Sequence, residues 1–356
     1  MSQRDNFGQS YDVSGSGTNS QGNHYCSRDY GSSASNSNAY HYSNQDGSYH
    51  YSNSDGSMIA ITFLAGLYSH YRTTERESIS AILSNFPRAI YQTAAKIQPD
   101  SPKIFTDSWK RNNPQHYYKL FTDKSALEFV EKLYTVRNPN IVQVFREVRQ
   151  RIIAADLLRY IVMFELGGIY ADVDSECLRA IDTWGVPQNG SINLVVGLET
   201  NELDAETFTD EQVAEFGFVH RLQFLQWVLM AMPGHVVMKT AIDRVVDGVL
   251  DKARVQQKPI DSLRFTHAEI LNLSGPGLYT HIVKAHIAEM EHRQVPDSEL
   301  ASTSFDHFVA DVMILPVNAW APGQRHSQSG PVDTALVYHS FAGSWKKSWW
   351  QDLWPW

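Results

Sequence analysis

The sequence predicts an α/β domain built on a mixed or mainly parallel sheet, preceded by a segment that has no core of its own. Two observations support this prediction. From about residue 85 onward, short apolar runs typical of strands alternate with longer runs of helical period. Before residue 58, the chain consists mostly of Ser, Asn, Gly, Tyr, Asp and Gln, with few branched aliphatic side chains. Such a segment cannot bury enough apolar surface to offset the entropy lost on ordering, so we expect it to be disordered.

These changes in composition divide the 356 residues into three parts. Residues 1–57 are expected to form a disordered tail, residues 58–84 a short apolar segment and linker, and residues 85–356 one folded domain. The apolar run from Met58 to Tyr68 falls short of the roughly 18 to 20 residues that span a bilayer, so it is no clear membrane anchor. A buried strand or short helix is the favoured interpretation of this run.

Charge and cysteine content exclude some classes of protein. The formal net charge of -9 argues against nucleic acid as a partner, because phosphate binding requires clustered Lys and Arg. The two cysteines, Cys26 and Cys177, are too few for a disulfide framework, and we expect them to be free thiols.

The first elements of the folded domain follow from their apolar spacing. Residues 86–94, FPRAIYQTA, predict a short strand. Residues 122–134 predict a helix with Asp123 as its N-cap. Residues 146–166 have the length and period of a longer helix. Gly167-Gly168 marks its end, because glycine tolerates the left-handed turn that follows a helix.

The alternation of strands and helices continues toward the C-terminus. Residues 193–199, NLVVGLE, predict a buried strand, and residues 311–320 are again strand-like. Helical patterns cover residues 222–232 and 236–249. The C-terminal run SWKKSWWQDLWPW is rich in tryptophan, and we expect some of these side chains to dock on the domain.

The stretch GGIYADVD, residues 167–174, sets two aspartates one residue apart after an apolar run. If it continues as a strand, successive side chains point to opposite faces. One face then carries Ile169, Ala171 and Val173, and the other carries Tyr170, Asp172 and Asp174. Two carboxylates on one side of a strand end form a hard oxygen site that suits Mg²⁺ or Mn²⁺. An Asp-x-Asp pair by itself is also common on solvated surface turns.

The helix before the glycines carries a second charged pair, Asp156 and Arg159, three positions apart and therefore on one face. A solvated ion pair is the alternative interpretation. The helix is apolar around most of its circumference, however, which favours burial, and buried charges require partners. A phosphate, a sugar or a metal ligand would supply them, and the guanidinium of Arg159 offers a planar fork to such a ligand.

The two charged pairs together favour binding of a nucleoside diphosphate. A cation held by carboxylates can bridge two phosphates and neutralise a departing diphosphate. Ligands of open α/β sheets lie beyond the carboxyl ends of strands, where we expect the Asp-x-Asp pair. The sequence lacks the GxxxxGK[ST] loop of P-loop NTPases, the GxSxG elbow and the HExxH helix. Glycosyl transfer from a sugar nucleotide is the chemistry that fits best.

Residues 154–184, AADLLRYIVMFELGGIYADVDSECLRAIDTW, resemble the DxD region of glycosyltransferase family 32, and most closely its fungal initiation-specific α-1,6-mannosyltransferases. The likeness extends from about Phe86 to Lys346 and includes FPRAIYQTA, NLVVGLE, RLQFLQWVLMAMPGH, LNLSGPG, DVMILPVNAWAPG and HSFAGSWK. The resemblance implies a GT-A fold, in which a Rossmann-like mixed sheet is flanked by helices. It assigns residues 85–356 to a single catalytic domain of this kind.

The resemblance also implies ligands and a cellular location. It implies a GDP-mannose donor, Mn²⁺ or Mg²⁺ as the cofactor, and retention of the α configuration. The implied acceptor is an N-glycan core, extended through an α-1,6 linkage in the Golgi. Other subunits of a mannosyltransferase complex are candidate partners.

Several residues of this chain match functional positions of the family. Asp172 and Asp174 match the pair that holds the metal and the diphosphate, and His339 matches a C-terminal metal histidine. Asp156 and Arg159 match the helix pair that contacts the donor sugar and phosphates, so these two and the Asp-x-Asp pair are the expected catalytic residues. The implied donor-binding residues are Tyr91, Gln92, Thr93, Gly168, Tyr170, Gly275, Gly277 and Trp345.

The sequence departs from the family pattern in three places. Where the family has IHQTW or IWQTW, residues 90–94 read IYQTA, so any stacking on the base falls to Tyr91. The second histidine of the usual HHFAGSW is Ser340 here, and the expected N-terminal anchor has no clear counterpart. The face formed by Gln223, Gln226 and Trp227 is expected to pack rather than to bind a ligand.

Two alternatives stay open from the sequence. One is a related transferase that uses another donor, such as a UDP-sugar, or an inositol-phosphoceramide lipid as its acceptor. The other is a non-catalytic subunit of a mannosyltransferase complex, in which the tail mediates association. The joint presence of Asp172, Asp174, Arg159 and His339 argues against the non-catalytic alternative.

Overall fold

The computed structural model describes residues 3–4, 10–18, 24–29, 39–43, 49–52, 58–61, 86–94, 103–187, 189–201, 209–302, 304–305, 307–323 and 329–340. By its internal contacts the chain divides into two compact units, Met1–Ile82 and Leu83–Trp356.

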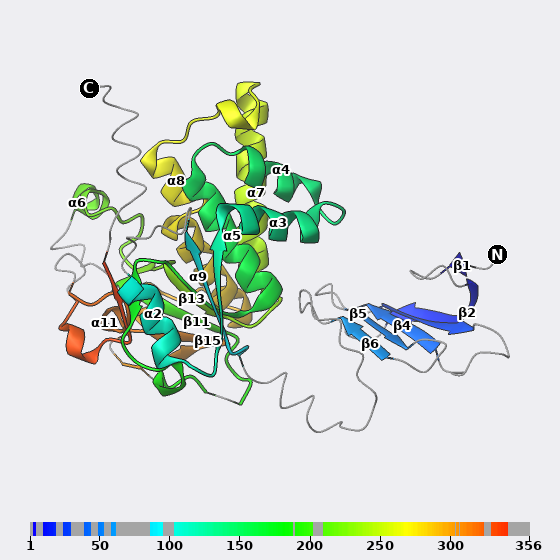
Figure 1. The fold of residues 1–356 in the computed structure, drawn as a ribbon, viewed down its shortest axis with the longest axis horizontal. Coiled ribbons are helices and arrows are strands. Elements are labelled where there is room, and N and C mark those ends of the chain that lie inside the picture. Colours follow the sequence, from blue (N-terminus) through cyan, green and yellow to red (C-terminus); the bar gives the residue numbers. More distant parts are fainter. Residues whose placement is uncertain are drawn as a thin grey trace. The chain divides into compact units, whose positions relative to one another are not determined.

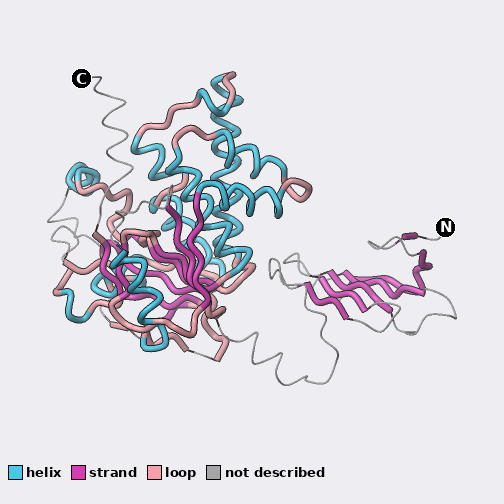
Figure 2. The backbone as a smooth tube through the Cα atoms, in the orientation of Figure 1, coloured by secondary structure: helices cyan, strands magenta, loops and turns pink. Residues whose placement is uncertain are grey.

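The first unit contains a six-stranded antiparallel sheet in the order β1-β2-β3-β4-β5-β6, drawn in magenta in Figure 2. Its strands are β1 (Gln3–Arg4), β2 (Ser10–Thr18), β3 (His24–Asp29), β4 (Ala39–Ser43), β5 (Tyr49–Ser52) and β6 (Met58–Ile61). The disorder that the sequence predicts for residues 1–57 stays a prediction, because the strands described here cover only part of that range. Strand pairing does not require apolar burial, and the described side chains at residues 12–18, 25, 27 and 29 are all exposed or partly exposed. The exposure of these side chains therefore agrees with the expectation that this segment has no core of its own.

The apolar run from Met58 to Tyr68 begins as a strand, because β6 pairs with β5. Its remaining residues, and most of the linker expected at residues 58–84, lie outside the described residues. The proposed boundaries of tail and linker stay predictions. Within the described ranges, no helix is long and apolar enough to cross a membrane.

The second unit is built on a mixed sheet in the order β14-β15-β11-β13-β9-β7-β8, with β12 paired to β11. Its strands are β7 (Ala89–Ala94), β8 (Tyr117–Thr122), β9 (Gly168–Ala171), β11 (Leu194–Thr200), β12 (Gln223–Phe224), β13 (Val228–Ala231), β14 (Phe308–Val309) and β15 (Val312–Leu315). β7 runs parallel to β8 and β9, and β11 runs parallel to β15, whereas β13 lies antiparallel between β9 and β11. The predicted α/β class with a mixed sheet is confirmed.

Helices flank this sheet, with α5 and α7 on one side and α2 and α11 on the other (Figure 1). The helices are α2 (Lys103–Asn112), α3 (Asp123–Tyr134), α4 (Pro139–Glu147), α5 (Arg151–Leu166), α6 (Asp210–Glu215), α7 (Val236–Gln256), α8 (His267–Leu273), α9 (Pro276–Met290), α10 (Asp297–Leu300) and α11 (Val317–Trp320). Most of α5 is buried, in agreement with its apolar circumference. A separate antiparallel pair joins β10 (Ser175–Cys177) to β16 (Val337–His339).

Four local expectations are corrected. Thr122 rather than Asp123 caps α3, since the Thr122 side chain accepts a hydrogen bond from the Ser125 amide. Residues 146–166 form the end of α4 and all of α5, separated where Val148 is extended. Residues 222–232, expected to be helical, contain β12 and β13, because the apolar run of a fully buried strand cannot be distinguished from a buried helix by period. The strand expected over residues 311–320 ends at Leu315, and α11 follows.

Close packing around β9 explains the two glycines at the end of α5. Gly167 and Gly168 have φ values of 63° and 86°, which favour glycine. A Cβ on Gly167 would lie 2.5 Å from Cδ of Pro233, and a Cβ on Gly168 would lie 2.6 Å from the carbonyl oxygen of Ala89. Backbone geometry alone is therefore enough to require glycine at residue 168, and the expected contact of Gly168 with the donor stays a prediction.

Candidate active site

Asp172 and Asp174 lie in a turn at the carboxyl end of β9 and not on a continuing strand. The Asp172 amide donates to the carbonyl oxygen of Trp227 at 2.8 Å, and the Ser175 amide donates to the carbonyl oxygen of Asp172 at 3.0 Å. The alternation expected over residues 169–174 stops at Ala171, and all four residues of β9 are buried. The turn nevertheless brings both carboxylates together at the strand end, as the sequence predicted.

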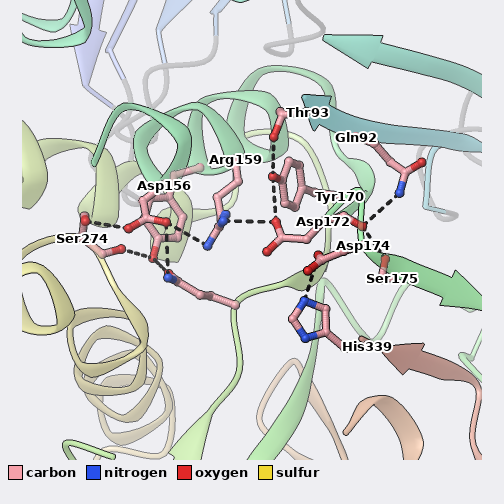
Figure 3. A network of polar contacts seen from close by, with 12 residues as sticks. Gln92, Thr93, Asp156, Arg159, Tyr170, Asp172, Asp174, Ser175, Ser274 and His339 are labelled. Carbon is pink, nitrogen blue, oxygen red and sulfur yellow. Dashed lines mark hydrogen bonds and ion pairs between the residues drawn. The ribbon is translucent and has the colours of Figure 1, made fainter. Parts of the chain in front are cut away.

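His339 reaches the same place from the C-terminal part of the chain. β16 pairs with β10 so that His339 lies opposite Ser175, and the Ser340 amide donates to the carbonyl oxygen of Asp174 at 3.0 Å. The Nε2 atom of His339 is 3.0 Å from Oδ1 of Asp174 (Figure 3). The structure therefore joins the histidine to the Asp-x-Asp pair, as expected.

Asp172, Asp174 and His339 fit a divalent cation. Their ligand atoms all lie within 4.8 Å of one another. The two aspartate side chains are 26% and 25% exposed and the histidine 8%, so the cluster is open on one side. Among the described residues nothing donates to Oδ2 of Asp172, which is available to a ligand. Carboxylate oxygens with one imidazole suit Mn²⁺, and Mg²⁺ also accepts the oxygens.

Arg159 connects the second charged pair to this cluster. Its Nη1 atom is 3.0 Å from Oδ1 of Asp156, and its Nη2 atom is 3.1 Å from Oδ1 of Asp172. The guanidinium is 5.3 Å from the ring centroid of Tyr170, within the range of a cation–π contact. Only 5% of its side chain is exposed, so two carboxylates and an aromatic ring fix its position beside the cluster.

Asp156 lies behind Arg159, with 1% of its side chain exposed. It accepts hydrogen bonds from the Ser274 hydroxyl at 2.6 Å and from Nε2 of Gln226 at 3.4 Å. The Tyr160 hydroxyl donates to Oε1 of Gln226 and so fixes the orientation of that amide. Burial raises the pKa of Asp156 to about 6, although Arg159 and Ser274 lower it. In this geometry Asp156 holds Arg159, and a direct contact with a donor sugar stays a prediction.

Tyr170 and Thr93 support the first aspartate. The Tyr170 hydroxyl donates to Oδ1 of Asp172 at 2.9 Å, and because its proton is used there, the Thr93 hydroxyl donates to Tyr170 at 2.9 Å. Tyr170 is fully buried. Both residues support the Asp-x-Asp turn in this geometry, and their expected contact with the donor stays a prediction.

Gln92 and Tyr91 also face the protein interior. The buried Gln92 amide donates to the carbonyl oxygen of Asp172 at 3.0 Å and accepts from the Tyr118 hydroxyl at 2.7 Å. Tyr91 is 5% exposed and packs against Tyr117 and Phe121. Because so little of Tyr91 is exposed, its expected role in stacking on a base finds no support in this geometry.

Gly275 and Gly277, which were also expected to bind the donor, lie at the start of α9. A Cβ on Gly275 would lie 2.8 Å from Cα of Leu271, and a Cβ on Gly277 would lie 2.8 Å from the carbonyl oxygen of Leu271. These two glycines therefore permit the tight α8–α9 junction. Trp345 lies outside the described residues.

The contacts that three residues make in the site were not predicted from the sequence. Gln226 and Ser274 bind Asp156, and Trp227 accepts from the Asp172 amide and stacks on His339. Gln226 and Trp227 were expected only to pack, on a predicted helix. In the structure they lie between the strands β12 and β13. No local signal reveals these contacts, because each joins segments that are distant in the chain.

A second possible metal cluster, His235, His286 and Asp311, is better explained by hydrogen bonds. Nδ1 of His235 accepts from the Val237 amide at 3.2 Å, so the proton of the neutral ring is on Nε2, which faces Oδ2 of Asp311 at 3.4 Å. Nε2 of His286 lies 2.8 Å from Oδ1 of Asp311. A metal on Nε2 of His235 would require a proton on Nδ1, where the Val237 amide proton already points.

The comparison with protein families identifies the region around the cluster. Residues 99–190 match the family described as "Glycosyltransferase sugar-binding region containing DXD motif". This match contains Asp156, Arg159 and both aspartates of the cluster, but not His339.

Relatives and one solved structure extend the comparison. The chain is 27% identical to the initiation-specific alpha-1,6-mannosyltransferase of Schizosaccharomyces pombe, over 74% of this chain and 64% of that protein. It is 26% identical to the protein of the same name from Candida albicans, over 73% of this chain and 72% of that protein. The solved "PaToxG Glycosyltransferase" superposes with a TM-score of 0.40 at 14% identity, over 60% of this chain and 77% of that one.

Proposed function

The chain is a glycosyltransferase with a DXD-containing sugar-binding region, and we propose that it transfers mannose from GDP-mannose to an N-glycan core. The proposed linkage is α-1,6 and the proposed outcome is retention of the α configuration. The observation that carries the proposal is the convergence of Asp172, Asp174 and His339 beside the buried guanidinium of Arg159. The names of the two fungal relatives support mannose and the α-1,6 linkage.

The chain's own residues supply positioning and charge. A Mn²⁺ or Mg²⁺ ion held by Asp172, Asp174 and His339 would neutralise charge on the departing diphosphate. Oδ1 of Asp172 accepts hydrogen bonds from Arg159 and Tyr170, so Oδ2 is the oxygen that would bind the cation. The fixed guanidinium of Arg159 adds positive charge next to the phosphates without reorganising during the reaction. No residue is assigned as a general base.

We further propose that the chain acts in the Golgi on glycoprotein acceptors, in association with other mannosyltransferase subunits. The resemblance of the sequence to the fungal mannosyltransferases of family 32 motivates this part of the proposal.

The test is transfer by the full chain from a panel of donors to a high-mannose N-glycan. We expect transfer from GDP-mannose with Mn²⁺, none after chelation with EDTA, and a product that an α-1,6-mannosidase cleaves. Asp172→Asn should abolish transfer, while Asp182→Asn, which alters an exposed ion pair with Arg88, should not. Transfer from a UDP-sugar, or only to inositol-phosphoceramide, would replace this proposal with the related-transferase alternative. Donor binding without hydrolysis or transfer would support a non-catalytic subunit.

A further inference from the structure

Trp227 contacts both ends of the candidate metal cluster. Its carbonyl oxygen accepts the hydrogen bond from the Asp172 amide at 2.8 Å, which fixes the start of the Asp-x-Asp turn. Its indole ring stacks on the imidazole of His339, with ring centroids 4.9 Å apart and an angle of 13° between the planes. One residue therefore contacts the two segments, β9 and β16, that bring the metal ligands together.

The indole itself is firmly held. Trp227 is 7% exposed, and its Nε1–H donates to the carbonyl oxygen of Trp320 in α11 at 3.2 Å. The residue directly precedes β13, whose Val228 is paired with Ala171 at the end of β9. The indole plane is thus defined by the sheet and by α11 before any ligand binds.

The imidazole of His339 depends on this plane for its orientation. Pairing of β16 with β10 fixes the His339 backbone, but rotation of the ring about its own bond is not set by strand pairing. The parallel stack on Trp227 selects the ring plane that points Nε2 at Asp174, 3.0 Å away. Partners that orient a ligand ring raise metal affinity because the ring does not have to be ordered on binding.

We propose that Trp227 is a positioning residue of the metal site: it holds the His339 ring in its ligating orientation and couples it to the Asp172 turn. This inference rests on the proposed function, since it assumes that the cluster binds a divalent cation. Trp227 itself contributes no ligand atom and is not a catalytic residue.

The experiment compares Mn²⁺ affinity in three variants of the full chain, measured from the electron paramagnetic resonance signal of free Mn²⁺. Trp227→Met fills much of the space without a ring plane, and its affinity should fall about 10- to 100-fold, as for other partners of metal ligands. Trp227→Phe restores a flat ring and should recover most of that affinity. Trp184→Met is the control: Trp184 is 1% exposed, donates Nε1–H to the carbonyl oxygen of Arg179, and packs on the rings of Trp109 and Trp320. It should lower the melting temperature and leave Mn²⁺ affinity unchanged.

A second measurement needs no metal. The ring protons of His339, assigned with His339→Gln, should resonate upfield in the wild-type and Trp227→Phe proteins, because they lie over an aromatic face. They should return toward ordinary values in Trp227→Met. If Trp227→Met does not fold, ordinary ring shifts in the wild-type protein would still overturn the proposal.

The possible failures can be distinguished. If the wild-type protein binds Mn²⁺ and Trp227→Met binds it equally well, this proposal is wrong and the proposed function stands. Equal losses of Mn²⁺ affinity in Trp227→Met and Trp184→Met would show that Trp227 contributes only packing. If the wild-type protein binds no Mn²⁺, the metal assignment of the proposed function fails, and the role of Trp227 fails with it.

Discussion

The guanidinium of Arg159 is bound to the first aspartate of the DXD motif, with Nη2 3.1 Å from Oδ1 of Asp172. Its other terminal nitrogen binds Asp156, so the buried cation lies between two carboxylates. Because these contacts fix the guanidinium, it does not shift when a ligand binds, and a ligand must bind where the guanidinium already lies. If the cluster binds the proposed nucleoside diphosphate, this fixed cation would stabilise the charge that develops as the diphosphate departs.

Arg159→Lys should therefore impair catalysis more than folding. A lysine ammonium cannot bind both carboxylates with the fork geometry of a guanidinium. Loss of one charged hydrogen bond costs roughly 1.5 to 3 kcal/mol, which corresponds to about 10- to 150-fold in kcat/KM for the sugar donor. Steady-state kinetics with varied donor measure this loss. The matched control is Arg137→Lys, since Arg137 also pairs with a buried carboxylate, that of Glu165, at 3.1 Å. Equal kinetic losses in both variants would contradict a specific role for Arg159.

Ser274→Ala should shift the acid limb of the pH–rate profile. Asp156, whose pKa burial raises to about 6, must be ionised to pair with Arg159, so activity should fall as the pH drops through that value. The Ser274 hydroxyl lowers this pKa, and its removal should move the limb to higher pH. Profiles of kcat/KM between about pH 5 and 8 would show the shift. Ser302→Ala, which removes a buried hydroxyl bound to the carbonyl oxygen of Ser304, should leave the limb in place.

Tyr170→Phe should weaken Mn²⁺ binding while the fold survives. The change removes the hydroxyl that donates to Oδ1 of Asp172 and leaves Thr93 without its acceptor. A net loss of about 1 kcal/mol in stability is expected from one hydrogen bond. Tyr134→Phe is the control, because Tyr134 donates to the Glu165 carboxylate at 2.6 Å away from the cluster. If calorimetric titration gave the same Mn²⁺ affinity for both variants, Tyr170 would be a packing residue only.

The burial of His235 predicts a fold that loses stability in mild acid. Burial lowers the pKa of His235, although Asp311 raises it, so the native state keeps this ring neutral. The unfolded chain takes up that proton near its ordinary pKa of about 6.5, and the free energy of unfolding therefore falls as the pH drops below that value.

Urea titrations at several pH values would measure this dependence. His235→Asn keeps a side chain that can cap α7 but cannot titrate, and it should flatten the slope between about pH 6.5 and 5. His281→Asn, at an exposed position of α9, should leave the slope unchanged. An unchanged slope in His235→Asn would show that other groups control the acid sensitivity.

Local residue types were enough to predict one part of the site. The end of α5 at Gly167 and the two carboxylates after β9 follow from glycine conformation and apolar spacing. His339 was assigned to the metal site only because the sequence resembles the family. The turn at residues 172–174 could not be predicted, because it depends on the carbonyl oxygen of Trp227, from a segment that was expected to be helical.

Sequence alone also did not show that several residues expected to contact the donor lie in the protein interior. Tyr91 and Tyr170 are polar aromatic side chains, and sequence alone does not show whether the hydroxyl of such a residue faces a ligand or a buried partner. In the structure, the sheet packing covers Tyr91, and Asp172 and Thr93 bind Tyr170. Burial is a property of the assembled layers, so local pattern did not reveal it.

Asp174→Asn tests the metal assignment most directly. The substitution keeps the size of the side chain and the turn, but it removes one formal charge from the cluster and weakens the pairing with Nε2 of His339. Mn²⁺ affinity should fall, and turnover should drop by orders of magnitude, since a misplaced metal costs roughly 3 to 5 kcal/mol and each 1.36 kcal/mol is about tenfold in rate. Asp172→Asn should be similarly severe, because it also disturbs Arg159.

Folding should survive in Asp174→Asn, because this side chain is 25% exposed and no core packing is lost. Asp182→Asn provides the control: Asp182 is 57% exposed and pairs only with the equally exposed Arg88 at 3.0 Å among the described residues. Such a surface ion pair contributes at most about 1 kcal/mol, so this variant should keep wild-type turnover and Mn²⁺ dependence. If Asp174→Asn matched it in both measurements, the carboxylates after β9 would be an ordinary solvated turn, and the divalent cation would have to be sought elsewhere or abandoned.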